Sequence, residues 1–585
     1  MLTRSLILMF ILFSVNCCCS YQEEYDFIIV GAGAAGCMLA NRLSEDPNST
    51  VLLIEAGGRE NFIEDIPILA ALPQLTPVNW GYETEKSSTA CLGLVGEKCK
   101  WPRGKVLGGT TTINYMAYTR GNKMDYNKWA NLGNTGWSYD EVLPYFLKFE
   151  NMLIPELAND TKYHSTKGEL AISQASFHTK ASLALLEAAK EKGAKVLDYN
   201  GEEQGGYSLI QSTLKDGVRW SANKAFLEPV RNRKNLKVLL RSQVTKILIH
   251  PENKTAYGVE YKRWSLLNMK ACARKEVILS AGVFGSAQLL MLAGIGPKDH
   301  LEDVKIPVLQ DSKVGYNLKD HYSFGNLFFI ANDSITIRLD NYIKDAFHVL
   351  EYLFTRKGLL TVTGGFESLG FEDVTGDGIP DIEVAFGGAT MGALKPVIWA
   401  WGAKPETFNT VYKNFAHMEI FTIFPLLMHP KSSGRLMLKD KNPLHKPLLF
   451  HNYFTHPDDM ATLIKGVRRS IELVDTHAFR KYGSKLFNKS LPACQKHEFN
   501  SDEYWECSAR HLTFSIYHQC GTCKMGPDSD PDAVVDPSLR VRGINNLRVI
   551  DASIIPTTVT GHIQAAVYMI AEKGASMIKS FWKNK

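Results

Sequence analysis

Hydrophobic and polar residues near the N-terminus follow the pattern of a β-α-β unit. An unbroken apolar run, residues 27–30, is typical of a strand buried on both faces. A glycine-rich turn follows it, and then a helical stretch to about Leu43. A polar turn at residues 44–50 leads to a second apolar run, residues 51–54, which Glu55 closes.

The glycines of the first turn have the spacing G-x-G-x-x-G, which predicts a dinucleotide site. Gly31 permits the tight turn, Gly33 lets a pyrophosphate approach the backbone, and Gly36 lets helix and strand pack closely. The helix N-terminus offers free N–H groups to the phosphates. Glu55 stands where a carboxylate accepts hydrogen bonds from the adenosine ribose. The motif does not choose between FAD and NAD.

Regular patterns return near the C-terminus. Residues 547–550 predict a strand that ends at Asp551, and residues 563–579 predict a helix. Between these ends, residues 320–510 mix apolar runs with prolines, loops and frequent aromatic residues. A length of 585 residues exceeds what one core supports, so we expect at least two domains of α/β class.

The N-terminal segment, residues 1–20, has the order of a signal peptide. Arg4 precedes an apolar run of about ten residues, and small residues follow. No later segment predicts a membrane span. Five N-x-S/T sequons then suggest a glycosylated, secreted chain, at Asn48, Asn159, Asn253, Asn332 and Asn488. A formal charge of +5 is too small to indicate a nucleic-acid partner.

The cysteines fit an oxidising compartment. Cys91 and Cys99 flank a glycine-containing turn, and Cys494 and Cys507 bracket a polar loop, so both pairs are candidates for small disulfides. The Cys520-x-x-Cys523 pair has no second pair at zinc-like spacing, and we expect no metal.

Several blocks of the chain resemble the glucose–methanol–choline (GMC) oxidoreductase family. Residues 103–114 look like its first signature, and residues 282–296 are a looser match to the second, with departures at Val283, Ala287 and Ala293. Residues 517–526 and 549–556 resemble its catalytic-histidine region and its closing flavin-binding strand. Residues 561–564 then fall where the family places its second catalytic residue.

The resemblance implies a Rossmann-type FAD-binding domain, residues 21–318 and 507–585, with an inserted α+β substrate domain, residues 319–506. The inserted domain would be an antiparallel sheet covered by helices. The cofactor is expected to be non-covalent FAD, because Ile113 replaces the histidine through which some relatives attach it. The implied cofactor-binding residues are Gly31, Gly33, Gly36, Glu55, Arg103, Thr110, Asn114, Val244 and Asp551.

The resemblance also assigns the chemistry to two histidines. His518 would accept the hydroxyl proton of an alcohol, and His562 would orient the substrate oxygen while hydride passes to flavin N5. The other histidines receive no functional interpretation. The block from Gly521 to Pro527 looks like the secreted insect branch of the family, although many members of that branch have Asn where this chain has His562.

The pair of histidines favours an oxidase that passes electrons to oxygen and makes hydrogen peroxide from an aryl, terpenoid or other primary alcohol. A quinone-dependent sugar dehydrogenase or an ecdysteroid oxidase is the alternative. A hydroxynitrile lyase and a non-catalytic FAD-binding protein are remoter hypotheses, because the fold alone does not fix the reaction.

Overall fold

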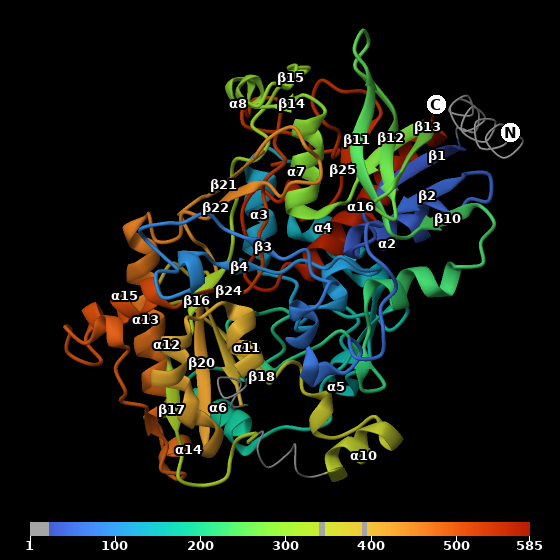
Figure 1. The fold of residues 1–585 in the computed structure, drawn as a ribbon. Coiled ribbons are helices and arrows are strands. Elements are labelled where there is room, and N and C mark those ends of the chain that lie inside the picture. Colours follow the sequence, from blue (N-terminus) through green and yellow to red (C-terminus); the bar gives the residue numbers. More distant parts are fainter. Residues whose placement is uncertain (1–22, 339–345, 389–394, 585) are drawn as a thin grey trace, which may run out of the picture.

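The computed structural model describes residues 23–338, 346–388 and 395–584, and shows two sheets, one at the upper right and one at the lower left of Figure 1. The predicted signal peptide lies outside the described residues. None of the described helices is long and apolar enough to cross a bilayer.

The first sheet has seven strands and is mostly parallel. Its path is β10 (Leu236–Leu239), β2 (Val51–Ile54), β1 (Glu23–Val30), β13 (Leu267–Leu279), β12 (Thr255–Arg263) and β11 (Ser242–His250), with β25 (Leu547–Val549) also paired to β13. The strands β1, β2, β10, β13 and β25 run parallel, whereas β11 and β12 form an antiparallel extension. The predicted strands at residues 27–30, 51–54 and 547–550 are confirmed.

Two helices from opposite ends of the chain lie side by side against this sheet. They are α2 (Ala34–Leu43) and α16 (Gln564–Lys583), which contact each other extensively (Figure 1). Both helices bury small and apolar side chains. The predicted helices are therefore confirmed, and the C-terminal segment completes the unit that the N-terminal motif begins.

The second sheet has eight strands, and every pairing in it is antiparallel. Its path is β23 (Lys485–Leu486), β17 (Phe328–Ile330), β20 (Ile420–Leu427), β19 (Ile382–Gly387), β18 (Phe366–Glu372) and β7 (Gly206–Leu209), and β16 (Tyr322–Phe324) joins β20 to β24 (Thr513–Ser515). The strands β7 and β24 come from segments that the sequence assigns to the FAD-binding domain, so the predicted domain boundaries do not coincide with the limits of the sheets.

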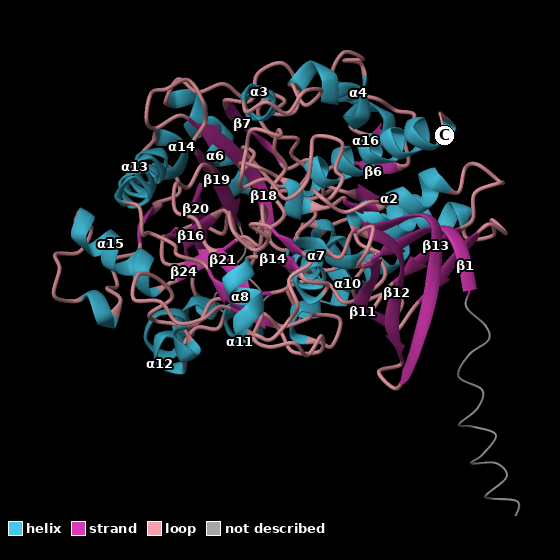
Figure 2. Cartoon of the chain, turned by 90° about the horizontal axis from the view of Figure 1, so that it is seen from above, coloured by secondary structure: helices cyan, strands magenta, loops and turns pink. Residues whose placement is uncertain are grey.

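Helices cover the second sheet on the side away from the first (Figure 2). They are α6 (Lys180–Glu191) and α13 (Pro457–Val474), which contact β18, β19 and β20. The helix α13 begins with proline and two aspartates, which suit the first turn of a helix. An antiparallel sheet covered by helices agrees with the predicted α+β substrate domain, and the whole has the predicted α/β class.

The described chain also forms further helices of six or more residues. They are α3 (Lys123–Asn131), α4 (Tyr139–Phe149), α7 (Gly282–Leu292), α8 (Lys298–Asp303), α10 (Ala346–Thr355), α11 (Lys395–Trp401) and α15 (Asp502–His511).

Candidate active site

A cavity of about 310 Å³ lies between the two sheets. One wall comes from the turn after β1, residues 102–117 and the start of α7, and we call it the cofactor wall. The other wall comes from β18, β19, β20 and the chain after β24, and we call it the substrate wall. The segment containing His562 closes the space between the two walls.

The three motif glycines play different structural parts in the cofactor wall. Gly31 has φ of +98°, and a Cβ there would lie 2.5 Å from the Ser280 carbonyl oxygen. A Cβ on Gly33 would have only the Gly109 Cα near it, at 4.0 Å, so this backbone is open to a ligand. A Cβ on Gly36 would lie 1.8 Å from the Gly31 oxygen. Gly31 and Gly33 line the cavity, whereas Gly36 lies behind it and permits close packing.

Glu55 follows the end of β2 and is buried. Its Oε2 accepts a hydrogen bond from the Ala32 N–H at 2.9 Å, and its Oε1 accepts one from the Gly57 N–H at 2.7 Å. Burial raises the pKa of this carboxyl to about 7. Glu55 therefore holds the glycine turn in shape while lining the cavity, and Val244 on β11 lines it too.

Arg103 is half-buried at the junction of the two walls. Its guanidinium donates to the Gln519 Oε1 and lies 5.5 Å from the centroid of the Phe284 ring. Burial lowers its pKa to about 10, and its Nε has no hydrogen-bond partner. Arg103 thus keeps one donor for a group in the cavity.

Thr110 lies within a short 3₁₀ turn, Gly109–Thr112, and Asn114 follows that turn. The Thr110 hydroxyl accepts from the Gly104 N–H at 3.2 Å. The Asn114 amide donates to the Gln564 Oε1, and the Nε2 of Gln564 is buried without a partner. Both predicted residues line the cavity.

Asp551 lies two residues after the end of β25, close to where the sequence places it. Its Oδ2 accepts from the Gly282 N–H at 2.9 Å and from the Ser286 hydroxyl at 2.6 Å, and its Oδ1 accepts from the Ser553 N–H at 2.8 Å. Burial raises its pKa. These contacts fix the start of α7 at the edge of the cavity.

The two predicted catalytic histidines meet in the cavity. The ring centroids of His518 and His562 lie 4.8 Å apart, with the rings at 78° to each other. Burial, followed by the neighbouring His562 and His321, holds the pKa of His518 well below its usual value. His518 is therefore neutral at neutral pH, the form that can accept a proton.

Glu383 is a residue of the substrate wall that sequence reasoning missed. It lies on β19, is fully buried, and its Oε1 is 2.9 Å from the His562 Nε2. Its Oε2 has no hydrogen-bond partner. Glu383 received no role from the sequence, and the strand order of the second sheet brings it to His562.

Asp320 and His321 were also missed, and both act on the His518 segment. Asp320 accepts from the His518 N–H at 2.9 Å and from the Gln519 Nε2 at 2.7 Å. The Nδ1 of His321 lies 2.9 Å from the Nδ1 of His518. His321, which received no functional interpretation from the sequence, therefore contacts the predicted base directly. An Asp-His pair at a predicted domain boundary gave no signal in the sequence.

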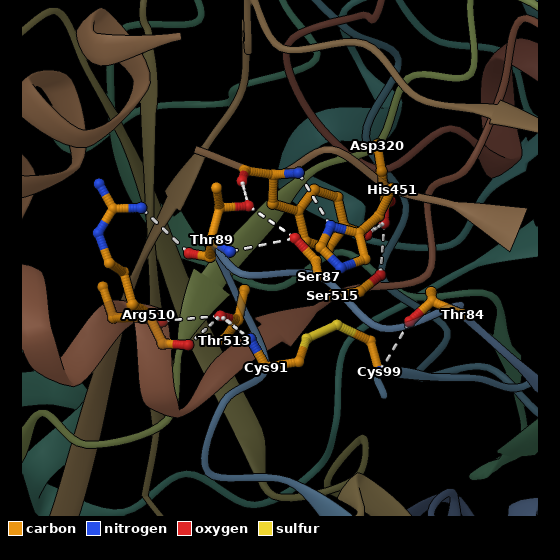
Figure 3. The surroundings of a disulfide bond; sticks show 12 residues. Thr84, Ser87, Thr89, Cys91, Cys99, Asp320, His451, Arg510, Thr513 and Ser515 are labelled. Carbon is orange, nitrogen blue, oxygen red and sulfur yellow. Dashed lines mark hydrogen bonds between the residues drawn. A yellow bond between two sulfur atoms is a disulfide. The ribbon is translucent and has the colours of Figure 1, made fainter. Parts of the chain in front are cut away.

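A disulfide between Cys91 and Cys99 lies beside this segment, as predicted (Figure 3). The Cys91 N–H donates to the Thr513 hydroxyl at 3.0 Å, and the Ser515 hydroxyl on the same strand donates to Asp320 at 2.6 Å. The disulfide thus helps to hold β24, from which the chain runs to His518. The predicted pair Cys494–Cys507 is also bonded.

Aromatic side chains make up much of the remaining wall. The ring of Phe424 lies 5.6 Å from Phe366 and 5.7 Å from Phe514, and Trp401 lies 4.9 Å from Phe514. All four line the cavity. Apart from the histidines and Glu383, this wall therefore offers an alcohol mainly apolar contacts.

Comparison with known proteins relates the chain to one family. Two models of this family, both described as GMC oxidoreductase, match the chain: the N-terminal model at residues 25–323 and the C-terminal model at residues 430–571. A glucose dehydrogenase [FAD, quinone] of Drosophila pseudoobscura pseudoobscura is 40% identical over 96% of this chain and 88% of its own. An alcohol dehydrogenase [acceptor] of Pseudomonas putida is 35% identical over 95% of each chain. A variant of the formate oxidase of Aspergillus oryzae superposes with a TM-score of 0.84 at 26% identity, covering 97% of this chain and 100% of its own.

Proposed function

Because this chain belongs to the GMC oxidoreductase family, and is therefore an FAD-dependent enzyme of alcohol- or sugar-type donors, we propose that it is secreted and oxidises an apolar primary alcohol, aryl or terpenoid, to the aldehyde. The acceptor in this proposal is oxygen, which becomes hydrogen peroxide. The observation that carries the proposal is the neutral, buried His518 facing His562 in a cavity whose substrate wall is largely aromatic.

The residues of the cofactor wall fit FAD. The open backbone at Gly33 leaves room for the pyrophosphate, and Arg103 Nε and Gln564 Nε2 are buried donors without a partner. We assign the adenosine part to the region of Glu55 and Val244. Arg103, Thr110, Asn114 and Asp551 then lie toward the flavin. Ile113 has no nucleophilic atom, which supports non-covalent binding.

When bound, FAD supplies the acceptor for the hydride. His518 takes the hydroxyl proton on Nε2, which requires that its Nδ1 carry a hydrogen. That hydrogen is donated to the Nδ1 of His321, 2.9 Å away, so His321 selects the tautomer of the base. His562 holds the substrate oxygen, and Glu383 fixes its ring by accepting from Nε2.

A quinone acceptor is the second candidate, because the 40% identical Drosophila relative is named for FAD and quinone. The oxidation of the alcohol is the same in both cases. Only the step that removes electrons from the reduced enzyme differs.

Secretion is supported by features at the surface. All five sequon asparagines are exposed, and two disulfides are present. The test is expression in insect cells, followed by mass spectrometry of the protein in the medium. Loss of about the first 20 residues and glycan on the sequons are expected, and retention in the cells would contradict the proposal.

The activity is tested by following the flavin spectrum of the purified protein. We expect an aryl or terpenoid alcohol to bleach the flavin without air, and air to restore it with one peroxide per alcohol oxidised. Slow recovery in air with fast recovery by a quinone would make the enzyme a dehydrogenase. If only sugars or only ecdysteroids bleach the flavin, the proposed class of aryl or terpenoid alcohols is wrong and that compound class is the substrate. No bleaching would favour a lyase, tested by cyanohydrin cleavage, or a binding protein.

A further inference from the structure

His562 lies at the end of residues 557–562, a segment without helix or strand that leads into α16. Such a segment has no repeating backbone hydrogen bonds, so its shape depends on contacts with other parts of the chain. The Trp129 indole donates to the Thr557 oxygen at 3.1 Å, and Asp125 Oδ2 accepts from the Thr560 N–H at 2.6 Å. The place of His562 in the cavity is therefore set from outside its own segment.

Thr119 contacts the backbone of His562 itself. The Thr119 hydroxyl accepts a hydrogen bond from the His562 N–H, and it also donates to the His562 carbonyl oxygen at 3.3 Å. Thr119 is buried, and it is not among the residues that line the cavity. Thr119 therefore acts on the reaction centre through His562 and not by contact with the alcohol.

The residue before His562 permits this close contact. Gly561 has φ of +133°, and a Cβ there would lie 2.5 Å from the Thr119 Oγ1 and 3.0 Å from the Thr119 Cβ. Any other residue at this position would push the threonine away from the His562 backbone. Gly561 and Thr119 therefore fit each other, and the hydroxyl reaches His562 only because the side chain of residue 561 is absent.

Thr119 is itself fixed on both sides. The Tyr118 N–H donates to the Gln211 oxygen at 2.8 Å, and the Arg120 N–H donates to the Asn200 Oδ1 at 2.7 Å. All five of these residues are buried. Thr119 is therefore a rigid support, and His562 takes its position from it.

The ring of His562 has a separate contact, with Glu383 on the substrate wall. The Nε2 of the ring lies 2.9 Å from the Glu383 Oε1. With Nε2 engaged in this way, the ring meets the substrate oxygen through Nδ1, the nitrogen nearer the backbone. The direction of Nδ1 depends on where the His562 backbone stands, and that backbone is what Thr119 contacts. Small errors in the alignment of groups around reacting atoms slow catalysis steeply.

We propose that Thr119 is a positioning residue that sets the direction of the His562 ring and so aims it at the alcohol oxygen. This inference rests on the proposed function, since it takes His562 to bind that oxygen. Glu383 fixes the ring, and Thr119 fixes the backbone that carries it.

The test removes the Thr119 hydroxyl and keeps the shape of the side chain. Thr119→Val should slow flavin reduction at saturating alcohol by about tenfold, the value of about one good hydrogen bond, with FAD content unchanged. Thr119→Ser retains the hydroxyl and should recover most of the rate. Thr476→Val is the matched control, because Thr476 is also buried and its hydroxyl donates to a backbone oxygen, that of Leu473, at 2.7 Å. It should keep the wild-type rate.

A double-mutant cycle separates positioning from general damage to the fold. In a His562→Ala background the backbone contact remains but the ring is gone, so adding Thr119→Val should change the rate by less than about twofold. An undiminished tenfold loss in that background would overturn the inference. A wild-type rate in Thr119→Val, or a serine variant as slow as the valine variant, would overturn it alone and leave the proposed function standing.

Nuclear magnetic resonance gives a readout that does not depend on turnover. The ring resonances of His562 in the FAD-loaded protein are assigned by their absence from His562→Ala. Thr119→Val should shift them, whereas Thr476→Val should not. If no alcohol bleaches the flavin, the proposed function fails, yet a shift confined to Thr119→Val still supports the positioning of His562. Ring resonances that stay in place in Thr119→Val would overturn the inference.

Discussion

The cofactor wall and the substrate wall of the cavity are built from different parts of the polypeptide. On the cofactor wall the turn after β1 presents backbone, and glycines at Gly31 and Gly33 set its shape. On the substrate wall His518, Glu383 and the aromatic rings present side chains, brought together from strands far apart in sequence. The cofactor wall therefore depends on positions that lack a side chain as well as on polar groups such as that of Arg103, whereas the substrate wall depends on the side chains that it presents.

The comparison predicts that the two walls fail in different ways. Substitutions that add side-chain atoms to the cofactor wall should distort its backbone and reduce flavin binding. Substitutions that remove side-chain atoms from the substrate wall should slow alcohol oxidation while the flavin stays bound. Four substitution or pH experiments test this contrast.

The largest effect is expected for Gly31→Ala. The new Cβ meets the Ser280 oxygen at 2.5 Å and stands at a φ of +98°, so the protein should lose its flavin and unfold at lower temperature. Gly33→Ala is the matched control, because its Cβ meets nothing closer than 4.0 Å. It should weaken FAD binding without lowering the melting temperature of the apoprotein. Flavin absorbance measures the FAD content of each variant, and thermal melting measures its stability. An equal fall in melting temperature for the two variants would contradict the prediction.

His518→Ala should slow flavin reduction by about 10²–10⁴-fold, the usual contribution of a general base. FAD content should remain that of the wild type, because His518 belongs to the substrate wall. Anaerobic stopped-flow absorbance gives the rate, and His250→Ala, an exposed histidine, is the control. Loss of flavin together with activity would show that the two walls are not separable.

His321→Phe should have a smaller effect, about tenfold on flavin reduction, because it acts through the orientation of His518. His321 also contributes to the lowered pKa of His518. Its removal should raise that pKa, so kcat/KM should begin to fall at a higher pH as the solution is made more acidic. A pH profile identical to that of the wild type would assign His321 a purely structural part.

The smallest effect is a dependence of stability on pH. Burial lowers the pKa of His321 to about 3 and that of His451 to about 4, and it lowers the pKa of His518 as well. Between these values and about 6.5, the unfolded chain binds protons that the folded chain does not. The stability from these histidines is thus present above pH 6.5 and is lost as the pH falls. The buried carboxyls of Glu55, Asp320 and Glu367, whose pKa values burial raises to about 7, 6 and 7, act in the opposite sense over the same range. His451→Phe should therefore shift the difference in melting temperature between pH 7 and pH 5 in favour of pH 5, and an unchanged difference would contradict the prediction.

The parts that the sequence predicts are those encoded by local pattern. The strand before Gly31, the helix α2 and the two small disulfides depend on neighbours in the chain, and periodicity or spacing reveals them. His518 and His562 were found only through the resemblance of their blocks. The contacts of Glu383, Asp320 and His321 depend on which strands are neighbours in the second sheet. Strand order cannot be inferred from the residue types alone. The strands β7 and β24 escaped assignment for the same reason.

The pairing of β25 with β13 has a consequence for how the chain is made. A ribosome that has completed β13 must add about 270 residues before β25 exists. At about 5–20 residues per second, the parallel edge of β13 then stays open for roughly 15 s to 1 min. The nascent N-terminal unit also lacks α16, so its apolar face waits uncovered for the same time. The N-terminal dinucleotide-type unit is therefore among the first parts of the chain to be synthesised and among the last to be completed.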